Sequence, residues 1–527
     1  MKTKLFCFPI IGILAGAFFQ SLEIARAAEP ASESKRAATN VPQASVGISD
    51  AKEQHAVIGV DESKQKASHT KHPDAQWFGE PQMGLFLHWG LSVVKPYPDI
   101  SWPMMPGRAL AGKRIADPNE RARIIREKDY NLNGKPPVVT PNEYWEQAKS
   151  FNPQHYNPEK WIVAAKEAGF TYAVLVTSHH EGFELWPSAF GGFNTTNHMG
   201  GRDLVKPFVD ACHKHGLKAG LYYSPGNWHF NREYENFLYY GAGRTNPEFP
   251  ELDADLNPRT AVRTKEEIAE HRKAYGETIR GQIEELLTRY GKIDLLWFDG
   301  CPPDLRTCIT FERMRELQPG IVLNPRFNGA GDFKTYEGSI PPATKPESNW
   351  AEFCTTWAPS WTYTTGSFFS NAGILTGLAH ARALNMNYLL GIGPDRDGEL
   401  HPDAHKNMSV LAAWMKTNGE ATRGTHSLPD GETASVYAAA KGNLRFLYVC
   451  PKFKERGIQE IHQRDEDLLP PTDTTVTLSG VAKPSAVTLF ADGCTLTYTY
   501  NEDARAVSVL VPATKRTKLM DVVQVKL

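Results

Sequence analysis

One short stretch of the sequence, residues 292–300, constrains the fold more than any other. Its apolar residues Ile293 and Leu295–Phe298 follow a Gly-Lys turn and precede Gly300, which is the pattern of a strand buried on both faces. Such a strand belongs in a parallel sheet covered by helices. The next residue is Asp299, and the carboxyl ends of parallel strands are where α/β folds and (β/α)8 barrels place their chemistry. Asp299 is therefore either a catalytic carboxylate or a structural group that caps the next element or accepts backbone hydrogen bonds.

The alternation of buried strands and helices continues through the middle of the chain. Asn157 opens a helix that Gly169 ends, and Thr264 with Glu267 forms the capping box of a long helix. Further strands are expected at residues 84–90, 171–177, 218–223, 321–324 and 387–392, and further helices near 202–215, 310–317, 372–385 and 403–418. Strands that alternate with helices predict an α/β fold, a (β/α)8-like barrel, over residues 73–425.

The pattern changes near Gly424, where the helical periods end. Short apolar runs then alternate with turns, at residues 434–437, 444–449, 486–490 and 507–511. Short strands at this spacing are typical of an antiparallel sandwich. We predict a small C-terminal β-sandwich over residues 426–527 that packs on the barrel.

The N-terminal part of the chain shows no pattern of a folded domain. Residues 1–27 have a charged start, an apolar run and an Ala-Arg-Ala site, which are the features of a cleaved secretory signal peptide. Residues 28–72 are rich in Ala, Ser, Lys, Gln and Glu, and we expect a disordered linker that contributes no chemistry. No segment is long and apolar enough to cross a bilayer, so the sequence predicts a secreted or periplasmic protein without a membrane span.

The charge balance predicts no electrostatic partner such as nucleic acid. The chain has 58 Lys and Arg against 60 Asp and Glu, its formal net charge is -2, and the two signs are well mixed. Twelve Trp and 19 Tyr suit a sugar-binding protein, although they suit an ordinary core as well. The sequence predicts no oligomeric state.

Polar side chains stand at or near the ends of several predicted strands. They are His88, His179, His180, Tyr222, Asp299 and Arg326. The adjacent histidines suggest a metal site, but neighbouring strand residues point to opposite faces and no second pair has ligand spacing, so we predict none. The chain has neither a Gly-x-Ser-x-Gly motif nor a Gly-rich phosphate loop, and we expect no cofactor. A carboxylate among His, Trp, Tyr and Arg suits glycoside hydrolysis, which needs a second carboxyl group.

Eight motifs follow one another between residues 77 and 425, at 86–90, 178–186, 201–205, 220–224, 296–300, 324–326, 331–337 and 393–398. In their order and spacing the chain resembles the α-L-fucosidases of glycoside hydrolase family 29. The resemblance implies an eight-fold-like barrel followed by a β-sandwich, in agreement with the alternation described above.

The resemblance also implies a role for each matching residue. Asp299 matches the nucleophile that forms a glycosyl-enzyme intermediate. Glu337 matches the usual position of the acid/base, with a solvated loop carboxylate as the alternative and Glu352, in the same irregular stretch, as its rival. The residues expected to line a fucose pocket are His88, Trp102, His179, His180, Tyr222, Trp297 and Arg326. The implied activity is that of an exported, retaining exo-α-L-fucosidase that hydrolyses fucosylated oligosaccharides or polysaccharides without cofactor or metal.

Two positions depart from the family pattern. Ser101 stands where the family commonly has a Glu before Trp102, and Glu181 stands where it usually has an Asp. The first change removes a charge and leaves room, which keeps open a glycosidase of the same fold for an α-L-galactoside or a sulfated fucoside. A basic cluster on the same long loop either favours the sulfated sugar or is a solvated helix face: Arg121, Arg123, Arg126 and Lys128. A third alternative is a sugar-binding protein that no longer hydrolyses its ligand.

Overall fold

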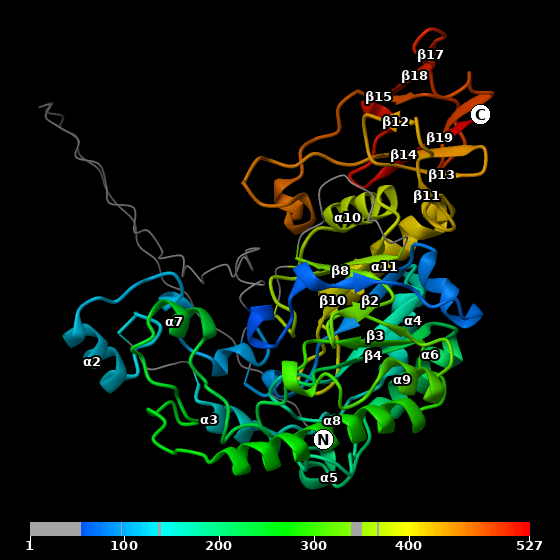
Figure 1. Cartoon of the computed structure of the whole chain (residues 1–527). Helices are drawn as coiled ribbons and strands as arrows, with labels where there is room; N and C mark the ends of the chain where they lie inside the picture. Colours follow the sequence, from blue (N-terminus) through cyan, green and yellow to red (C-terminus); the bar gives the residue numbers. More distant parts are fainter. Residues whose placement is uncertain (1–53, 96, 98, 135–138, 339–349, 366–367) are drawn as a thin grey trace, which may run out of the picture. The chain divides into compact units, whose positions relative to one another are not determined.

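Eight parallel strands form the central sheet of the structure, a computed structural model that describes residues 54–527 apart from 96, 98, 135–138, 339–349 and 366–367 (Figure 1). In sheet order they are β6 Val322–Leu323, β5 Leu295–Phe298, β4 Lys218–Tyr223, β3 Tyr172–Ser178, β2 Met83–Leu87, β10 Asn387–Ile392, β9 Ala351–Thr356 and β8 Lys334–Glu337. This order follows the chain around the sheet, as in a (β/α)8 barrel. Among the described residues β6 and β8 each pair on one side only, so the barrel is open at one seam. The predicted (β/α)8-like barrel is confirmed.

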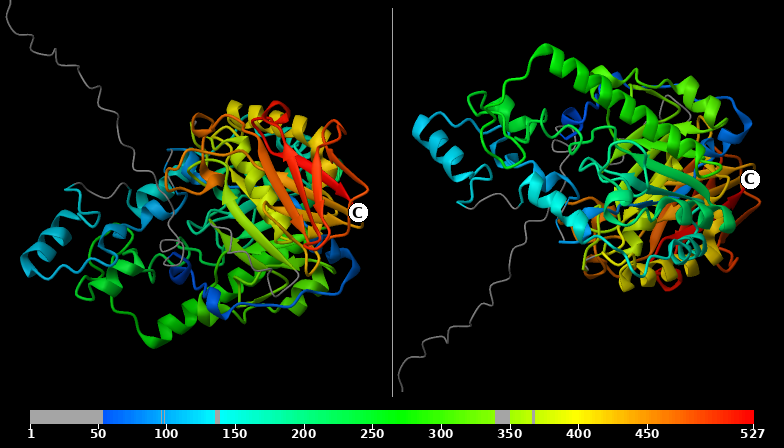
Figure 2. Two further views of the ribbon diagram at one scale, coloured as in Figure 1. Left: turned by 90° about the horizontal axis from the view of Figure 1, so that it is seen from above. Right: turned by 90° about the horizontal axis from the view of Figure 1, so that it is seen from below.

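Helices connect the strands and pack around the sheet, and the long α8 runs along one side of it (Figure 2). They include α4 Pro158–Glu167, α5 Thr195–His198, α6 Val205–His215, α8 Lys265–Thr288, α9 Phe311–Leu317, α10 Asn371–Ala383 and α11 Pro402–Asn418. The Asn157 side chain accepts a hydrogen bond from the Glu159 backbone and caps α4. Thr264 and Glu267 exchange both hydrogen bonds of a capping box at the start of α8. These caps, which the sequence predicted, set the points at which the chain leaves the strand ends and turns back along the sheet.

Two long connections, which we call excursions, extend from the barrel at the carboxyl ends of its strands. The β2–β3 connection contains η3 Leu91–Val93, η4 Trp102–Met104, η5 Arg108–Leu110, α2 Pro118–Glu127, α3 Pro141–Trp145 and η6 Glu146–Lys149. The β4–β5 connection adds α7 Tyr240–Thr245, which packs on η5. Arg114 and Glu248 form a salt bridge between the two excursions, so each supports the other above the sheet.

Alternate strand positions fill the interior of the barrel. Phe86, Tyr172, Tyr222, Trp297 and Leu389 form one buried cluster inside the sheet. The residues that follow two of them, Tyr223 and Phe298, belong to the separate core between sheet and helices. This inward and outward alternation places aromatic side chains directly below the ends of β2 to β5.

Strands β8 and β9 were not predicted, because their sequences are less apolar than those of the other strands. Glu352 on β9 points into the barrel, where it is fully buried and accepts hydrogen bonds from Trp297 and Tyr172. A buried carboxyl group with two donors has its hydrogen bonds satisfied, but it interrupts the apolar run by which a strand is recognised.

Two antiparallel sheets follow the barrel. The first contains β11 His426–Ser427, β13 Ala438–Lys441, β14 Leu444–Val449, β19 Asp521–Lys526 and β16 Ala486–Leu489, and the second contains β12 Thr433–Ala434, β15 Thr474–Ser479, β18 Ala506–Val511 and β17 Tyr498–Asn501. Both sheets contribute to one aliphatic core, as in a sandwich. The predicted C-terminal β-sandwich is confirmed, whereas its boundary at residue 426 stays a prediction. Hydrogen bonds from Trp414 to the Met520 carbonyl (2.7 Å) and from Tyr448 to the Ala421 carbonyl (2.7 Å) join it to the barrel helices.

Residues 54–72 differ from the disordered linker that was predicted for 28–72. They form a helical turn, η1 Glu62–Lys64 and β1 Lys66–Ala67, and η2 Pro73–Gly79 follows. Strand β1 pairs in parallel with β7 Ala330–Gly331, and Ile58 and Val60 insert into the main core. Two apolar side chains and a two-residue strand are too few to give a pattern in the sequence, but they suffice to hold the segment on the barrel.

The predicted signal peptide, residues 1–27, and residues 28–53 of the predicted linker lie outside the described residues. In the part of the chain that is described, no helix combines the length and the apolar content needed to cross a membrane.

Candidate active site

One cavity lies at the carboxyl ends of the barrel strands, and all nine residues predicted for the site line it. They are His88, Trp102, His179, His180, Tyr222, Trp297, Asp299, Arg326 and Glu337. His88, the histidine pair, Asp299 and Arg326 follow β2, β3, β5 and β6, while Tyr222 and Glu337 lie at the carboxyl ends of β4 and β8. The parallel sheet thus brings together groups that are far apart in the sequence.

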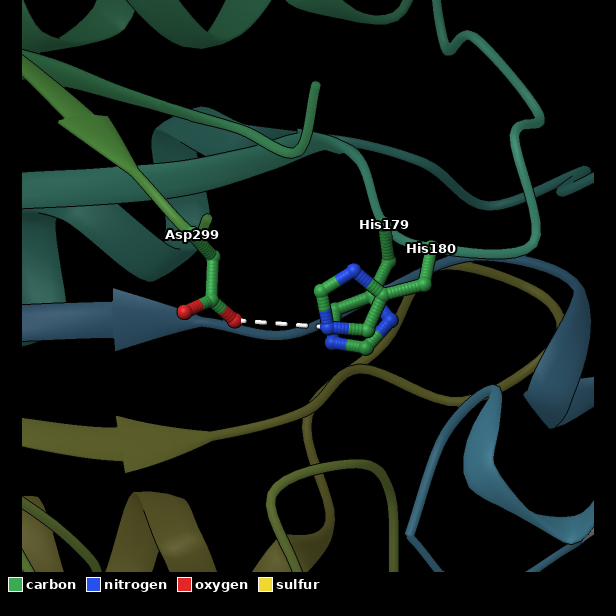
Figure 3. Close-up of side chains that lie close together, drawn as sticks. All are labelled: His179, His180 and Asp299. Carbon is green, nitrogen blue, oxygen red and sulfur yellow. Dashed lines mark ion pairs between the residues drawn. The ribbon is translucent and has the colours of Figure 1, made fainter. Parts of the chain in front are cut away.

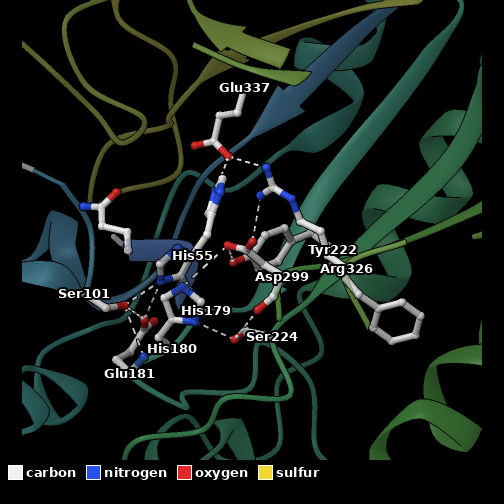
Figure 4. Close-up of polar contacts among 12 residues, drawn as sticks. His55, Ser101, His179, His180, Glu181, Tyr222, Ser224, Asp299, Arg326 and Glu337 are labelled. Atoms are coloured by element: carbon white, nitrogen blue, oxygen red, sulfur yellow. Dashed lines mark hydrogen bonds and ion pairs between the residues drawn. The ribbon is translucent and has the colours of Figure 1, made fainter. Parts of the chain in front are cut away.

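Asp299 is held by a full set of polar neighbours (Figure 4). Arg326 donates from Nη1 to Oδ1 (2.9 Å), and Tyr222 donates its hydroxyl to Oδ2 (2.8 Å). His180 Nε2 lies 3.5 Å from the same Oδ2 atom. Burial alone would raise the pKa of Asp299, but the hydrogen bond with His180 and the charge of Arg326 outweigh it and hold that pKa well below its usual range. Asp299 is therefore ionised and fixed in orientation at neutral pH.

Glu337 shares the guanidinium of Arg326 with Asp299. Arg326 Nη2 donates to Glu337 Oε2 (2.7 Å), and His55 Nε2 donates to the same oxygen (3.0 Å). Burial opposes ionisation of Glu337, but the charge of Arg326 and the hydrogen bond from His55 overcome it and lower the pKa to about 2. Without a ligand, Glu337 is thus a carboxylate, and it lies next to the carboxylate of Asp299.

His88 and His179 are uncharged when nothing is bound. Burial lowers the pKa of His88 to about 3, although the carboxylates of Glu337 and Asp299 oppose it. Burial also lowers the pKa of His179 well below its usual value. Among the described residues, the buried Nδ1 of His88 has no hydrogen-bond partner. A neutral imidazole with an unpaired ring nitrogen at the edge of a cavity can bind a ligand hydroxyl group.

Aromatic rings form the walls between these polar groups. Tyr222 stacks on Trp297 with ring centroids 5.5 Å apart, and Arg326 lies over the Trp297 ring at 4.8 Å. Trp102 meets His180 edge-on at 5.4 Å, and Trp361 packs against His88 at 4.8 Å. Flat apolar faces next to hydrogen-bonding groups match the two kinds of surface that a sugar ring presents.

His179, His180 and Asp299 are also the candidates for a metal site, because one ligand atom from each lies within 4.8 Å of the others (Figure 3). Their other contacts favour a different use. Ser224 bonds His180 Nδ1 at 2.6 Å, and both oxygens of Asp299 already accept hydrogen bonds from Arg326 and Tyr222. Arg326 also supplies the positive charge that a metal would bring to Asp299. The geometry therefore suits an ionised nucleophile better than a metal ligand.

Comparison with known proteins identifies the family. The sequence model of the α-L-fucosidase family matches residues 51–420. The chain belongs to the α-L-fucosidase family. It is 26% identical to the tissue α-L-fucosidase of Rattus norvegicus over an alignment of 368 residues, and the match covers 66% of this chain and 70% of the rat protein. It is 25% identical to the human tissue enzyme over an alignment of 431 residues, and the match covers 78% of this chain and 81% of that protein.

Solved structures of α-L-fucosidases share its fold. α-L-Fucosidase isoenzyme 1 from Paenibacillus thiaminolyticus superimposes with a TM-score of 0.62 at 26% identity, over 86% of this chain and 98% of that one. A family 29 α-L-fucosidase from Bacteroides thetaiotaomicron gives a TM-score of 0.61 at 21% identity, over 89% and 97% of the two chains. The resemblance to glycoside hydrolase family 29 is thus confirmed.

Within this α-L-fucosidase fold, Glu352 lies below the cavity instead of in its wall. It accepts hydrogen bonds from Trp297 Nε1 (2.8 Å) and from the Tyr172 hydroxyl (2.8 Å), and it is fully buried. Burial raises its pKa to about 7, against the opposing hydrogen bonds from Trp297 and Tyr172. Because Glu352 does not line the cavity, its contacts indicate a support for the Trp297 ring, and Glu337 is the carboxyl group placed next to Asp299.

The two departures from the family pattern contact each other. Ser101 donates to the Glu181 carboxylate, and Ser101 Oγ lies 2.7 Å from His179 Nδ1. Because the serine proton goes to Glu181, His179 is the donor in the second hydrogen bond, and its Nε2 remains an acceptor. Neither Ser101 nor Glu181 lines the cavity. The pair therefore fixes the orientation of His179, and burial raises the pKa of Glu181 to about 7.

The basic cluster on α2 is separate from the cavity. Arg123 is bound to Glu120, Glu127 and Asp129, and Arg126 to Glu127. Arg121 and Lys128 donate to backbone carbonyls. None of the four lines the cavity, so the solvated helix face is the interpretation that the structure favours.

Sequence analysis missed several residues of the cavity wall. They are Gln54, His55, Ile58, Phe86, Asp99, Ile100, Cys354 and Trp361. Phe86 lies within the motif at residues 86–90, which is a signal that a closer search finds, whereas Trp361 follows β9, a strand that the sequence did not predict. Gln54, His55 and Ile58 come from the segment expected to be disordered, and no periodicity or motif marks them.

Proposed function

We propose that the chain is a retaining exo-α-L-fucosidase in which Asp299 is the nucleophile and Glu337 the acid/base. The observation that carries this proposal is the bridge of one guanidinium between the two carboxylates, with Arg326 Nη1 on Asp299 and Nη2 on Glu337. Retaining glycosidases hold their carboxyl pair about 5–5.5 Å apart, and inverting enzymes need about 6.5–9.5 Å to admit a water molecule. A shared guanidinium holds the two carboxylates close together, which favours the closer class.

In the first step, Asp299 attacks the anomeric carbon and the glycosidic oxygen leaves with a proton. Asp299 is ionised, and the hydrogen bonds from Tyr222 and Arg326 fix its carboxylate before the substrate arrives. The proton comes from Glu337, which must first be protonated because its pKa is lowered to about 2 in the ligand-free site. Turnover of substrates with poor leaving groups therefore favours lower pH, where more of Glu337 carries the proton.

In the second step, water releases the sugar from Asp299. Glu337 is then ionised and accepts a proton from the attacking water, while the bond between Asp299 and the anomeric carbon breaks. The low pKa of Glu337 suits this role, since a carboxylate that is stable as an anion is ready to act as a base. Arg326 neutralises whichever of the two carboxylates is charged at each stage.

The sugar is recognised by neutral groups around an aromatic wall. His88 and His179 are uncharged imidazoles with a ring nitrogen available to a hydroxyl group, and Trp297 and Trp102 offer apolar surface. Such a pocket binds an uncharged deoxy sugar, with the apolar methyl group of fucose against a ring and its hydroxyls against the imidazoles. The substrates we propose are terminal α-L-fucosyl residues of oligosaccharides or polysaccharides, and the signal-like residues 1–27 support an exported enzyme.

The test is the configuration of the first product. The purified protein is given an aryl α-L-fucoside, and the released sugar is followed by proton NMR before mutarotation. We expect α-L-fucose to appear first. If β-L-fucose appears first, the retaining mechanism is wrong. The same assay with an aryl α-L-galactoside and a sulfated fucoside tests the related sugars, and a protein that binds fucose but hydrolyses none of these is a binding protein.

A further inference from the structure

The N-terminal segment Gln54–Val60 lies on the catalytic face of the barrel. Its helical turn is closed by hydrogen bonds from Ile58 to the Gln54 carbonyl (3.3 Å) and from Val60 to the His55 carbonyl (2.7 Å). Ile58 and Val60 are 5% and 7% exposed and belong to the main core. Because both side chains are buried in the core, the segment has a fixed position in the fold.

The loop that follows Asp299 is shaped to receive this segment. Gly300 has a φ of 82°, and a side chain there would collide with the carbonyl oxygen of Ile58. Gly59 packs in the same way on the carbonyl of Cys301, and Arg306 donates to the Gly59 carbonyl. Two glycines at the contact and one side-chain hydrogen bond fix the segment directly beside the nucleophile.

His55 extends from this segment to Glu337. Its Nε2 lies 3.0 Å from Glu337 Oε2, and its side chain is 8% exposed. Arg326 donates to the same Oε2 atom (2.7 Å), so two donors hold one carboxylate oxygen from different sides. Gln54, the preceding residue, donates to Asp99 Oδ2 (3.4 Å) on the β2–β3 connection, which ties the segment to that connection at the cavity wall.

We propose that His55 is a positioning residue for Glu337 and that the segment Gln54–Val60 is a wall of the active site. This inference rests on the proposed function. With Oε2 held by His55 and Arg326, Oε1 is the oxygen left to carry the proton to and from the glycosidic oxygen. His55 thereby sets both the direction of the carboxyl group and the pH range over which it is protonated.

The charged and titratable groups that face Glu337 come from five parts of the chain. They are His55, Arg326, Asp299, His88 and Cys354. The hydrogen bond from His55 lowers the pKa of Glu337, so its removal raises that pKa and keeps the acid protonated to higher pH. The alkaline limb of the pH profile of kcat/KM is therefore expected to move to higher pH in a variant without this donor.

The experiment compares the wild type with His55→Ala and His55→Gln on an unactivated disaccharide fucoside and on 4-nitrophenyl α-L-fucoside. His55→Ala should lose about ten- to a hundredfold in kcat/KM on the disaccharide, because the acid is misplaced, and only a few-fold on the activated substrate. Its alkaline limb should move upward. His55→Gln should recover most of the loss, because its amide group can donate to the same oxygen.

Lys64→Ala is the matched control, since Lys64 is exposed on η1 of the same N-terminal region and forms a salt bridge with Asp61, and neither residue lines the cavity. It should match the wild type on both substrates. Thermal unfolding of each variant separates catalysis from stability. An equal loss on both substrates with an unchanged pH profile, or no loss at all, overturns the role of His55. If the wild type releases no fucose, or if Asp299→Ala keeps its activity, the proposed function fails instead.

Discussion

The two sides of the cavity are built in different ways. On one side, which we call the strand side, His88, His179, His180, Tyr222 and Trp297 lie on or directly after β2 to β5 and are fixed by the hydrogen bonding of the sheet. On the other, the segment side, Gln54, His55, Ile58, Asp99 and Ile100 come from the N-terminal segment and the β2–β3 connection.

The difference matches what each side has to recognise in the proposed reaction. A glycosidase for one terminal sugar always binds the same ring, and rigid strand ends hold its binding groups with the precision that this needs. The leaving group differs between glycans, and it departs beside Glu337, where the segment side begins. We therefore expect changes on the strand side to affect all fucosides and changes at Glu337 to depend on the leaving group.

The largest effect is expected from Asp299→Ala. Loss of the nucleophile should lower kcat/KM on the order of 10^4-fold or more for every fucoside, whatever its leaving group. Azide should restore part of the activity and give β-L-fucosyl azide, because it attacks from the vacated face. Initial rates and the NMR spectrum of the azide product measure both outcomes. Residual activity within tenfold of the wild type on any substrate contradicts the assignment.

Glu337→Ala should separate the substrates by leaving group. Fucosides with poor leaving groups should lose about 10^2–10^4-fold, whereas activated aryl fucosides, whose departing oxygen needs little protonation, should lose far less. Azide should here give α-L-fucosyl azide, since it replaces the water of the second step. The comparison of two substrates in one assay checks this. If both substrates are slowed equally, Glu337 is not the acid, and the other carboxyl groups of the barrel, Glu352 first, have to be tested.

Glu352→Gln should change stability more than catalysis. The pKa of Glu352 is raised from 4.5 to about 7, so the folded state binds its proton more tightly than the unfolded state does. The wild type is thus most stable below pH 4.5 with respect to this group, and it loses about 3 kcal/mol as pH rises to 7. The variant lacks this loss. Urea unfolding at both pH values should show that the free energy of unfolding of the wild type falls relative to that of the variant as pH rises.

On activity, Glu352→Gln should slow activated and unactivated fucosides by the same modest factor, since Gln still accepts a hydrogen bond from Trp297. The difference in free energy of unfolding between the two proteins is the decisive quantity. A constant difference from pH 4.5 to 7 would mean that Glu352 has an ordinary pKa and is not a buried support of the strand side.

The smallest effect is expected from Arg126→Ala on α2, outside both sides of the cavity. Its side chain is 67% exposed and pairs with Glu127. The free energy of unfolding should change by less than about 0.5 kcal/mol. Turnover of plain and of sulfated fucosides should match the wild type within twofold. A loss confined to the sulfated substrate would show that α2 belongs to the binding surface after all.

The strand side was predictable and the segment side was not, for a physical reason. Strands such as β4 and β5 are continuous apolar runs, so their ends can be found in the sequence, and Tyr222 and Asp299 are located with them. His55 reaches Glu337 across 282 positions of the sequence, from a segment whose composition indicates disorder. Its place depends on Ile58, Val60 and a two-residue strand, and contacts of that kind exist only in the folded chain.

The barrel itself was predicted, but part of it was found only in the structure. Strand β9 carries Glu352 toward the interior, and β8 ends in Glu337, so neither has the apolar pattern of a buried strand. The interaction of Ser101 with Glu181 is a similar case. Each position departs from the family pattern, and only the structure shows that the two side chains are hydrogen-bonded to each other.

The open seam between β6 and β8 has a consequence for how such an enzyme can diverge. Strand β8 pairs only with β9 in the described part of the chain. A shift in its register therefore breaks the hydrogen bonds to one neighbouring strand, whereas a shift of an inner strand breaks those to two. Glu337 stands at the end of this strand, whereas Asp299 follows β5, which is paired on both sides. Insertions and deletions next to β8 can therefore relocate the proposed acid/base during evolution while the proposed nucleophile keeps its place.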